Sequence, residues 1–456
     1  MKRHAWIWVP AGLLLAAAVA SEIDRAHAAG PAPVADPGVA SRFFLPTAGD
    51  ARNVINPTIE TDAAGRLHMI YPAYAIGDAF YATCDDGCAR AEDVKSVKLE
   101  TDGTVANAML AIGPDGRPQA LLATFHRVYY ATCTGDCTRR DGWKLSVIRD
   151  HAGDEEVTGE AFAIAPSGKP AFVAHTTRML FGIGQKQPAT KYLRCAGDDC
   201  HDRASWKETT IVPDQIWQES TLRFDARGRP RLATIAIMNA EPREAAAYAE
   251  CNEACDTEKG WTGVGLLPAF SDRQIERIDP AIAMELTPAG GPRVAVLARN
   301  PGGKRNLAYM ACDSGCTDGK SWAIRGLIEL DSVGAGVDLA LAGGERPRIV
   351  YTVQSNIFLA HCDKDCGEEK DWGLAKVELG SEMKRDDIFL YPNCTVAAWF
   401  LRHPSIALGK DGQPRVAYRA EDMSGGFTRP DITRGGCRAG ADMTLARFAR
   451  VIGVRR

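Results

Sequence analysis

The chain has 456 residues, of which 45% are hydrophobic and 25% are charged, a composition that excludes disorder, collagen and coiled coil. Its 54 Lys and Arg residues against 58 Asp and Glu residues give a net charge of −4, so the basic surface of a nucleic-acid-binding domain is absent and we expect no nucleic-acid partner. The 44 glycines and 25 prolines favour short elements joined by many turns.

The first 28 residues have the features of a secretory signal peptide. Lys2 and Arg3 lie in a basic segment, an uncharged apolar run extends to Ser21, and residues 26–28 read A-H-A, a cleavage site of the A-x-A type. The apolar run is shorter than the roughly 20 residues that a membrane span needs. We therefore predict a signal peptide, then a linker over 29–41, and a periplasmic or secreted mature protein with no stable membrane insertion, in a compartment where disulfides persist.

Pairs of closely spaced cysteines recur along the rest of the chain. The six pairs are Cys84 and Cys88, Cys133 and Cys137, Cys195 and Cys200, Cys251 and Cys255, Cys312 and Cys316, and Cys362 and Cys366. Five pairs are followed by a tryptophan: Trp143, Trp206, Trp261, Trp322 and Trp372. Successive pairs are 49, 62, 56, 61 and 50 residues apart, a period typical of propellers and solenoids.

A second pattern precedes each cysteine pair. An alternating apolar stretch, a tight G-x-P turn and another apolar stretch follow one another, as in residues 108–123 and 404–420. Val, Ile, Leu and Tyr fill the stretches and Gly, Pro and Asp fill the turns, which predicts β-strands joined by tight turns. Each repeat is then strand A, turn, strand B, loop, strand C, cysteine turn and strand D. Four antiparallel strands make one blade of a β-propeller.

The repeats predict an all-β, seven-bladed β-propeller that forms a single domain over residues 42–456. The seventh pair of strands A and B lies near 405–418, and its strand C is expected at Leu445–Arg450, aligned with Leu307–Cys312. The chain then ends before a fourth strand. Because Arg42–Pro46 precedes the first strand A as strand D does elsewhere, we expect it to complete the last blade and remove the free sheet edges.

Each cysteine pair is expected to form a local disulfide that closes the turn between strands C and D. In the chain-entropy model, a loop of about five residues contributes about 2 kcal/mol. The alternatives are a redox pair, a zinc site and, at Cys200-His201, a haem attachment site. Zinc needs four ligands gathered together, whereas the blade turns lie far apart around a ring. Cys394 and Cys437 fall outside the pattern but on one face, and we predict that they form a seventh disulfide.

The side chains at the start of each strand A are expected to crowd around the central axis. They are Asn56, Asn107, Glu160, Glu219, Asp279, Asp338 and His403. Three interpretations apply: a hydrated polar plug, a site for a hard cation such as Ca²⁺, or an acid/base pair. No other cofactor or metal is expected.

The B–C loops and the D–A linkers are expected on this same face. They carry Arg127, Arg178, Arg299, Arg419, His126, His175, Trp217 and Trp399. Guanidinium groups suit carboxylate or phosphate groups of a ligand, and the alternative is that they are solvated or pair with the axial acids. The tryptophans either stack on sugar rings or pack between blades.

The cysteine turn CDSGCTDGKSW, from Cys312 to Trp322, looks like a Cys-bridged variant of the Asp-box of sialidase-type (BNR) propellers. In that family the box lies at the same turn, ends in Trp and is structural. The resemblance covers roughly residues 42–450 as a repeat pattern and implies the propeller fold. It implies no catalytic residue, because the family's R-I-P motif is represented only by RFFLP in the expected closing strand. The arginine triad and the Tyr/Glu pair cannot be mapped position by position.

Three classes of function are consistent with these observations. The first is a propeller that binds a glycan or an extracytoplasmic protein through its axial face. The second is a glycan-cleaving enzyme: a sialidase-like hydrolase using two axial acids, about 5–5.5 Å apart if retaining, or a polysaccharide lyase using Arg and His. The third is a purely structural assembly component. Whether the protein is an enzyme stays open at this point.

Overall fold

The computed structural model describes twelve parts of the chain: residues 37–47, 54–73, 77–150, 155–176, 189–213, 216–237, 244–268, 281–299, 305–330, 336–383, 399–422 and 443–454. The predicted signal peptide and most of the predicted linker lie outside the described residues. No helix among the described residues is long and apolar enough to cross a membrane.

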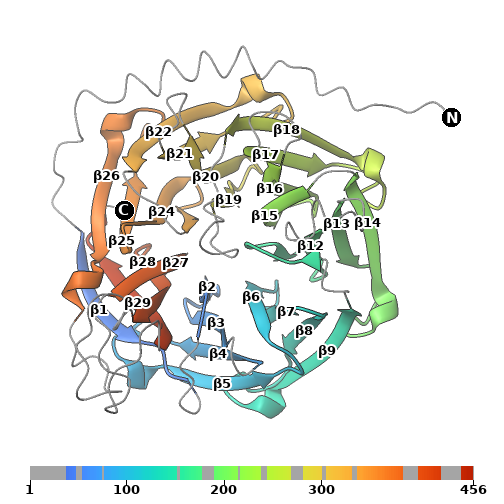
Figure 1. The fold of residues 1–456 in the computed structure, drawn as a ribbon, viewed down its shortest axis with the longest axis horizontal. Coiled ribbons are helices and arrows are strands. Elements are labelled where there is room, and N and C mark those ends of the chain that lie inside the picture. The colour runs from blue at the N-terminus through green and yellow to red at the C-terminus, as the bar shows by residue number, and fades with distance from the viewer. Residues whose placement is uncertain are drawn as a thin grey trace, which may run out of the picture.

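Seven antiparallel sheets surround a central axis (Figure 1), as the repeats predicted. Blade 1 consists of β2 (Thr58–Thr61), β3 (Leu67–Ala73), β4 (Asp78–Cys84) and β5 (Lys95–Glu100). Blade 2 consists of β6 (Val105–Ile112), β7 (Pro118–Thr124), β8 (Arg127–Cys133) and β9 (Trp143–Asp150). Blade 3 consists of β10 (Glu155–Glu156), β11 (Phe162–Ile164), β12 (Pro170–Thr176), β13 (Ala189–Cys195) and β14 (Trp206–Pro213), with β10 and β11 both paired to β12.

The remaining blades repeat the four-stranded pattern. Blade 4 consists of β15 (Ile216–Phe224), β16 (Pro230–Ile237), β17 (Glu244–Cys251) and β18 (Trp261–Pro268). Blade 5 consists of β19 (Ile282–Leu286), β20 (Pro292–Arg299), β21 (Arg305–Ala311) and β22 (Ala323–Leu330). Blade 6 consists of β23 (Val337–Ala342), β24 (Arg346–Val353), β25 (Asn356–Cys362) and β26 (Trp372–Glu378). Blade 7 consists of β27 (Trp399–Leu408), β28 (Pro414–Asp422), β29 (Met443–Ile452) and β1 (Gly38–Phe44).

Short 3-10 turns are the helical elements of the described chain. They are η2 (Ala91–Asp93), η3 (Arg140–Gly142), η5 (Arg203–Ser205), η6 (Glu258–Gly260), η7 (Gly319–Ser321), η8 (Glu369–Asp371) and η9 (Gly380–Glu382). All except η9 follow a cysteine turn and lead into strand D. The A–B turns end as expected at a glycine in the left-handed region, such as Gly116 (φ 76°) and Gly228 (φ 74°), where a side chain would be strained.

The N-terminal strand closes the ring, as predicted. β1 pairs antiparallel with β29, so blade 7 is assembled from both ends of the described chain. The closing strand begins at Gly38, earlier than the expected Arg42. Phe448 lies opposite Ala417, whereas Tyr309 lies opposite Ala295, and both alanines lie three residues after the proline that begins strand B. Phe448 therefore corresponds to Tyr309, whereas the predicted alignment matched it with Met310 and was wrong by one residue. Hydrophobicity did not reveal the error, because both alignments match Phe448 with an apolar residue.

Disulfides close all six cysteine turns, as predicted. Their Cα atoms are 5.5 to 5.8 Å apart. Because Cys195 and Cys200 are bonded to each other, neither sulfur is available for haem attachment. The ring of His201 instead lies between blades 2 and 3, near the hydroxyls of Thr132 and Ser146. Cys394 and Cys437 lie outside the described residues, so the seventh disulfide stays a prediction.

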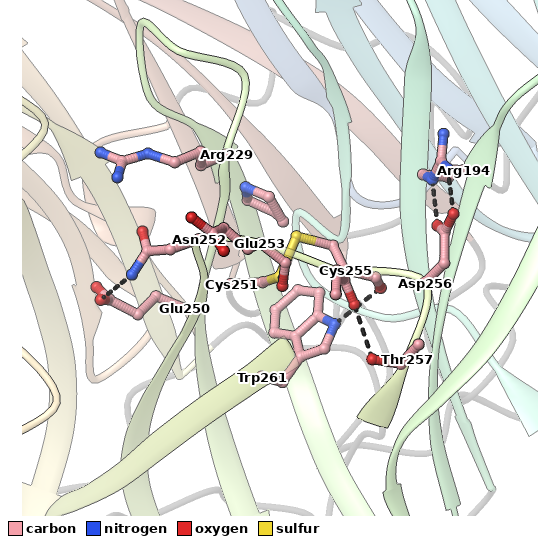
Figure 2. Close-up of a disulfide and its surroundings, with 12 residues drawn as sticks. Arg194, Arg229, Glu250, Cys251, Asn252, Glu253, Cys255, Asp256, Thr257 and Trp261 are labelled. Atoms are coloured by element: carbon pink, nitrogen blue, oxygen red, sulfur yellow. Dashed lines mark hydrogen bonds and ion pairs between the residues drawn. A yellow bond between two sulfur atoms is a disulfide. The ribbon is translucent and has the colours of Figure 1, made fainter. Parts of the chain in front are cut away.

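Five disulfide turns end in a tryptophan, as the Asp-box does, and the tryptophan of each such box joins its turn to the preceding blade. In Figure 2 the indole Nε1 of Trp261 donates to the carbonyl of Cys255 at 3.1 Å, and the four other box tryptophans make the same bond at 2.8–3.1 Å. The Trp261 ring packs edge-on against Tyr192 of blade 3, with centroids 5.1 Å apart. The same tyrosine–tryptophan contact recurs at the four other junctions that end in a box tryptophan. The box is therefore a contact between blades as well as a closed turn.

A buried ion pair fastens blade 7 to blade 6. Arg447 of β29 donates two parallel bonds to Glu378 of β26, at 2.6 and 2.7 Å, and the hydroxyl of Tyr418 donates to the same carboxylate. Arg42 of β1 donates to the carbonyl of Val377, so the closing strand also reaches blade 6. A paired and fully hydrogen-bonded carboxylate tolerates burial that a lone one does not.

Glu378→Gln is expected to lower the free energy of unfolding by about 3 kcal/mol, because Arg447 stays buried without its charge partner. The matched control is Glu382→Gln, which removes the half-exposed pair with Lys376 and is expected to cost less than about 1 kcal/mol. The measurement is urea unfolding followed by tryptophan fluorescence. Equal effects of the two variants would contradict a role of Glu378 in fastening the ring.

The double variant Cys251→Ala with Cys255→Ala is expected to lose about 2 kcal/mol of stability, because a short loop is no longer closed in the unfolded chain. Trp261→Phe keeps most of the ring contact but removes the indole donor, and is expected to cost about 1 kcal/mol. Calorimetric melting of the oxidised protein measures both. Wild-type stability of the double variant would show that the disulfide is not a structural staple.

Candidate functional site: the propeller axis and its surrounding face

The start of strand A has an unusual backbone in several blades. Asn56, Glu219 and His403 have φ values of 45°, 48° and 51°, in the left-handed region that non-glycine residues seldom adopt. Gly159 and Gly336 have positive φ at the corresponding position of blades 3 and 6. The pairing of strands A and B shifts by a bulge next to Glu219 and next to His403. A bulge kinks the strand and redirects its side chains.

The predicted axial residues consequently occupy three positions of the repeat. Asn56, Glu219 and His403 lie at the left-handed position itself. Asp338 lies two residues beyond that position in blade 6 and pairs with Val350, three residues after the proline near the start of strand B. Asn107 pairs with Ala123, five residues after the corresponding proline of blade 2, and so lies nearer the left-handed position. Glu160 lies between, one residue after Gly159. Asp279 lies outside the described residues.

Side chains at these positions bind the backbone of the next blade. The Asn107 amide donates to the carbonyl of Val157 at 3.1 Å, and the Thr221 hydroxyl donates to the carbonyl of Ile282 at 3.3 Å. The carboxylate of Glu219 accepts from the Ala281 N–H at 2.9 Å. These bonds join blades 2 to 3 and 4 to 5 near the axis.

The same arrangement continues across the ring closure. Asp338 accepts from the Ile406 N–H at 2.7 Å, and the Ser405 hydroxyl accepts from the Ile59 N–H at 3.2 Å. These bonds join blade 6 to blade 7 and blade 7 to blade 1. Glu219 and Asp338 are only 1% and 4% exposed. Both carboxylates are thus used in holding the inner strands together.

A second set of charged side chains meets across the axis. Arg223 of β15 donates one bond to Glu160 and another, at 2.7 Å, to Glu285 of β19. Glu60 of β2 feels the charges of all three, and Asp338 of β23 feels the charge of Glu160. We call these five side chains the axial cluster. They come from blades 1, 3, 4, 5 and 6, and their one guanidinium, that of Arg223, contacts two of the four carboxyls.

Burial governs the protonation of the axial cluster. It raises the pKa of Glu60 to about 8, with Arg223 opposing the shift and Glu285 and Glu160 adding to it. Burial also raises the pKa of Asp338, helped by the charge of Glu160, and that of Glu285, against the pull of Arg223. Burial acts to lower the pKa of Arg223, but Glu285, Glu160 and Glu60 hold it above the ordinary value. A group in low dielectric stays neutral unless a partner compensates its charge.

Glu60, Arg223 and Glu285 were not predicted, because only the residues at the beginning of each strand A were expected near the axis. The signal was present in the alternation of the strand: Glu60 and Arg223 each lie two residues beyond a threonine, Thr58 or Thr221, that bonds to the next blade. Residues two apart on a strand point to the same side. The polar threonine therefore marks the side that faces the axis.

The predicted acid/base pair and cation site at the axis stay predictions. Glu160 pairs with Arg223, and the oxygens of Asp338 accept from the backbone N–H groups of Leu339 and Ile406. Among the described residues, no three His, Cys, Asp or Glu side chains come together as metal ligands.

Several of the predicted loop residues are engaged within the protein. Arg419 donates to Glu421 at 3.2 Å, and His175 is buried beside the hydroxyl of Thr158. Trp399 begins β27, and its ring centroid lies 5.9 Å from that of Phe44 in the closing strand. Trp399 is therefore a packing residue between β27 and β1. Trp217 belongs to β15. Arg178 and the side chain of Arg299 lie outside the described residues.

One B–C turn stays exposed on the face where the strands A begin. Phe125, between β7 and β8, is 48% exposed, and the neighbouring His126 is exposed as well. Arg127 forms ion pairs with Asp102, which lies just before β6, and with Asp150 at 3.3 Å. We call Phe125, His126 and Arg127 with these two aspartates the Phe125 turn. His126 and Arg127 were predicted, but Phe125 was not; its signal in the sequence is an apolar residue within a short polar turn.

Comparison with known proteins gives similarity of structure only. No protein-family model matches the chain, and no curated protein sequence matches it. A protein of unknown function from Dyadobacter fermentans is 11% identical, with a TM-score of 0.46, over 92% of this chain and all of that one. The NanB sialidase of Streptococcus pneumoniae is 10% identical (TM-score 0.43; 92% and 71% covered), and an α-L-arabinanase of Penicillium chrysogenum is 10% identical (TM-score 0.41; 92% and 98% covered). At these scores no functional residue is carried over to this chain.

Glu219→Gln is expected to leave stability nearly unchanged, because the amide oxygen still accepts from the Ala281 N–H. Glu219→Ala leaves that buried donor unpaired and is expected to cost about 1–3 kcal/mol. Thermal melting of both variants measures the difference. If Gln were as destabilising as Ala, the charge of Glu219 rather than its acceptor oxygen would be what the structure requires.

Proposed function

We propose that this protein is an exported, non-catalytic binding module that holds a neutral glycan on its axial face. The observation that carries the proposal is the Phe125 turn, where a large aromatic side chain stays 48% exposed beside a group of paired polar side chains. Phe125 and Ile452 are the only large hydrophobic side chains among the described residues that are exposed to this degree. An aromatic ring offers a flat apolar surface, which suits the C–H face of a sugar.

The polar groups of the turn favour a neutral ligand over an acidic one. Arg127 is paired with Asp102 and Asp150, and Asp150 is also paired with Arg203, so positive charge is not in excess. Together they offer N–H donors and carboxylate acceptors side by side. A sugar hydroxyl both donates and accepts, so it matches such a mixed set, whereas a sialate or uronate would need an unpaired cation.

The axial acids support binding rather than catalysis. Glu219 and Asp338 hold neighbouring blades together, and Glu160 is paired with Arg223. A hydrolase needs one carboxyl poised as an acid and another free to act as base or nucleophile. Engaged in this way, the three carboxyls lack that freedom.

Phe125→Ala is expected to weaken binding of a neutral oligosaccharide about tenfold or more, the loss typical of an anchoring aromatic side chain. The matched control is Ile452→Ala, which removes the other exposed hydrophobic side chain, at the cysteine-turn end of β29, and leaves binding unchanged. A glycan array followed by calorimetric titration of the oxidised mature protein measures both. An extracytoplasmic protein captured through Phe125 with no glycan bound, or cleavage of the glycan, would overturn the proposal.

A further inference from the structure

A row of charged side chains continues outward from the Phe125 turn. Arg127 begins β8 and lies directly opposite Asp150, the last residue of β9. The Nε of Arg127 is 3.3 Å from Oδ1 of Asp150, and the Nη1 of Arg203 donates to Oδ2 of the same carboxylate at 2.5 Å. Arg203 begins η5 in blade 3, and Asp102 also pairs with Arg127. We call Asp102, Arg127, Asp150 and Arg203 the polar row, whose charges alternate from blade 2 to blade 3.

The polar row lies at the surface along its whole length. Its four side chains are between 43% and 57% exposed, so solvent reaches each of them. Ion pairs that are exposed to this degree contribute little to stability, because water screens the charges and two flexible side chains have to be ordered. The fold therefore does not depend on the row.

The row keeps hydrogen-bonding positions open on both kinds of side chain. A guanidinium has five N–H donors. Within the described part of the chain, the Arg203 side chain uses donors of Nη1 alone, and the Arg127 side chain uses those of Nη1 and Nε. Each oxygen of Asp150 has one guanidinium partner and can accept a second bond. A ligand hydroxyl can therefore donate to one member of the row and accept from the next.

These positions favour a ligand longer than a single sugar. Sugar hydroxyls both donate and accept, and a linear chain repeats them along its length. A ring placed on Phe125 lies beside Arg127, whereas Asp150 belongs to the next strand and Arg203 to the next blade. Two arginines and two aspartates give the row no net charge, which suits neutral sugars.

The junction of blades 1 and 2 has the same elements without a link to an exposed aromatic ring. Arg140 begins η3 as Arg203 begins η5, and it donates to Glu100, the last residue of β5, at 2.9 Å. This second row continues through a lysine to Asp78, the first residue of β4, whose side chain is only 9% exposed. Its inner end is buried, whereas the polar row begins at the Phe125 turn. Arg140 is therefore a matched control for Arg203.

We propose that the ligand is a linear neutral oligosaccharide, which extends from Phe125 along the polar row, and that Arg203 determines the length of chain that is bound. The inference rests on the proposed glycan binding at the Phe125 turn. It adds a chain length to that proposal and places Arg203 at the outer end of the site.

The test measures affinity against chain length. The oxidised mature protein is titrated calorimetrically with cello-, xylo- and malto-oligosaccharides of two to six sugars. For wild type, affinity is expected to rise with length in the series that binds and then to level off. Arg203→Ala is expected to weaken binding of the hexasaccharide about tenfold and that of the disaccharide less than about twofold, because only the longer chain reaches the outer contact. Arg140→Ala is expected to follow wild type at every length, and both variants are expected to melt at the wild-type temperature.

The variants separate this inference from the proposed function. Phe125→Ala is expected to weaken binding of every chain length, whereas Arg203→Ala acts on the longer chains alone. Equal affinity of wild type for all lengths, or equal effects of Arg203→Ala on the disaccharide and the hexasaccharide, would overturn the inference and leave glycan binding at Phe125 standing. An equal loss in Arg140→Ala would overturn it as well. Wild-type protein that binds none of the three series would overturn both proposals.

Discussion

The pairing of β1 with β29 is the contact on which the rest of the ring depends. Each blade has one face against the preceding blade and one against the next, so an open array would leave two faces and two sheet edges in water. β1 supplies the fourth strand of blade 7, and Glu378 then anchors blade 7 to blade 6 through Arg447. Phe43 and Phe448 pack together at 5.1 Å in the same cluster as Val94 of blade 1. Val94 follows η2 where the other boxes have Trp.

Two concentric sets of contacts then repeat around the ring. On the outside, each box tryptophan lies on a tyrosine of the preceding blade and is held by a carbonyl of its own disulfide turn. On the inside, a polar side chain at the start of strand A binds the next blade's backbone. These polar residues nearest the axis therefore have a structural use.

Much of the fold was predictable because its sequence signals are local and recur in each repeat. The cysteine spacing, the G-x-P turns and the alternation of strands A and B fixed the number of blades, the position of the disulfides and the ring closure. The alignment of β29 was one residue out because Phe448 and Met310 are both apolar, so hydrophobicity does not separate the two alignments. The closing strand was predicted short because its alignment rested on Arg42–Pro46, the segment that precedes the first strand A, whereas the strand begins at Gly38.

The site was less predictable, for a physical reason. Its residues come together from different blades, and no local pattern records that Arg223 meets Glu160 and Glu285 from neighbouring strands. Glu219 and Asp338 look like catalytic acids in sequence, yet each accepts a hydrogen bond from a backbone N–H group of the next blade. Only packing distinguishes an acid that serves a neighbouring blade from one that serves a substrate.

The most direct test of this account is a crystal structure of the mature protein with a bound neutral oligosaccharide. The account predicts a sugar ring stacked on Phe125, with its hydroxyls bonded to Arg127 and Asp102 and with the ion pair between Glu160 and Arg223 intact. A sugar seated on the axis between Glu160 and Asp338, with that ion pair broken, would contradict it and would identify the axis as a catalytic centre.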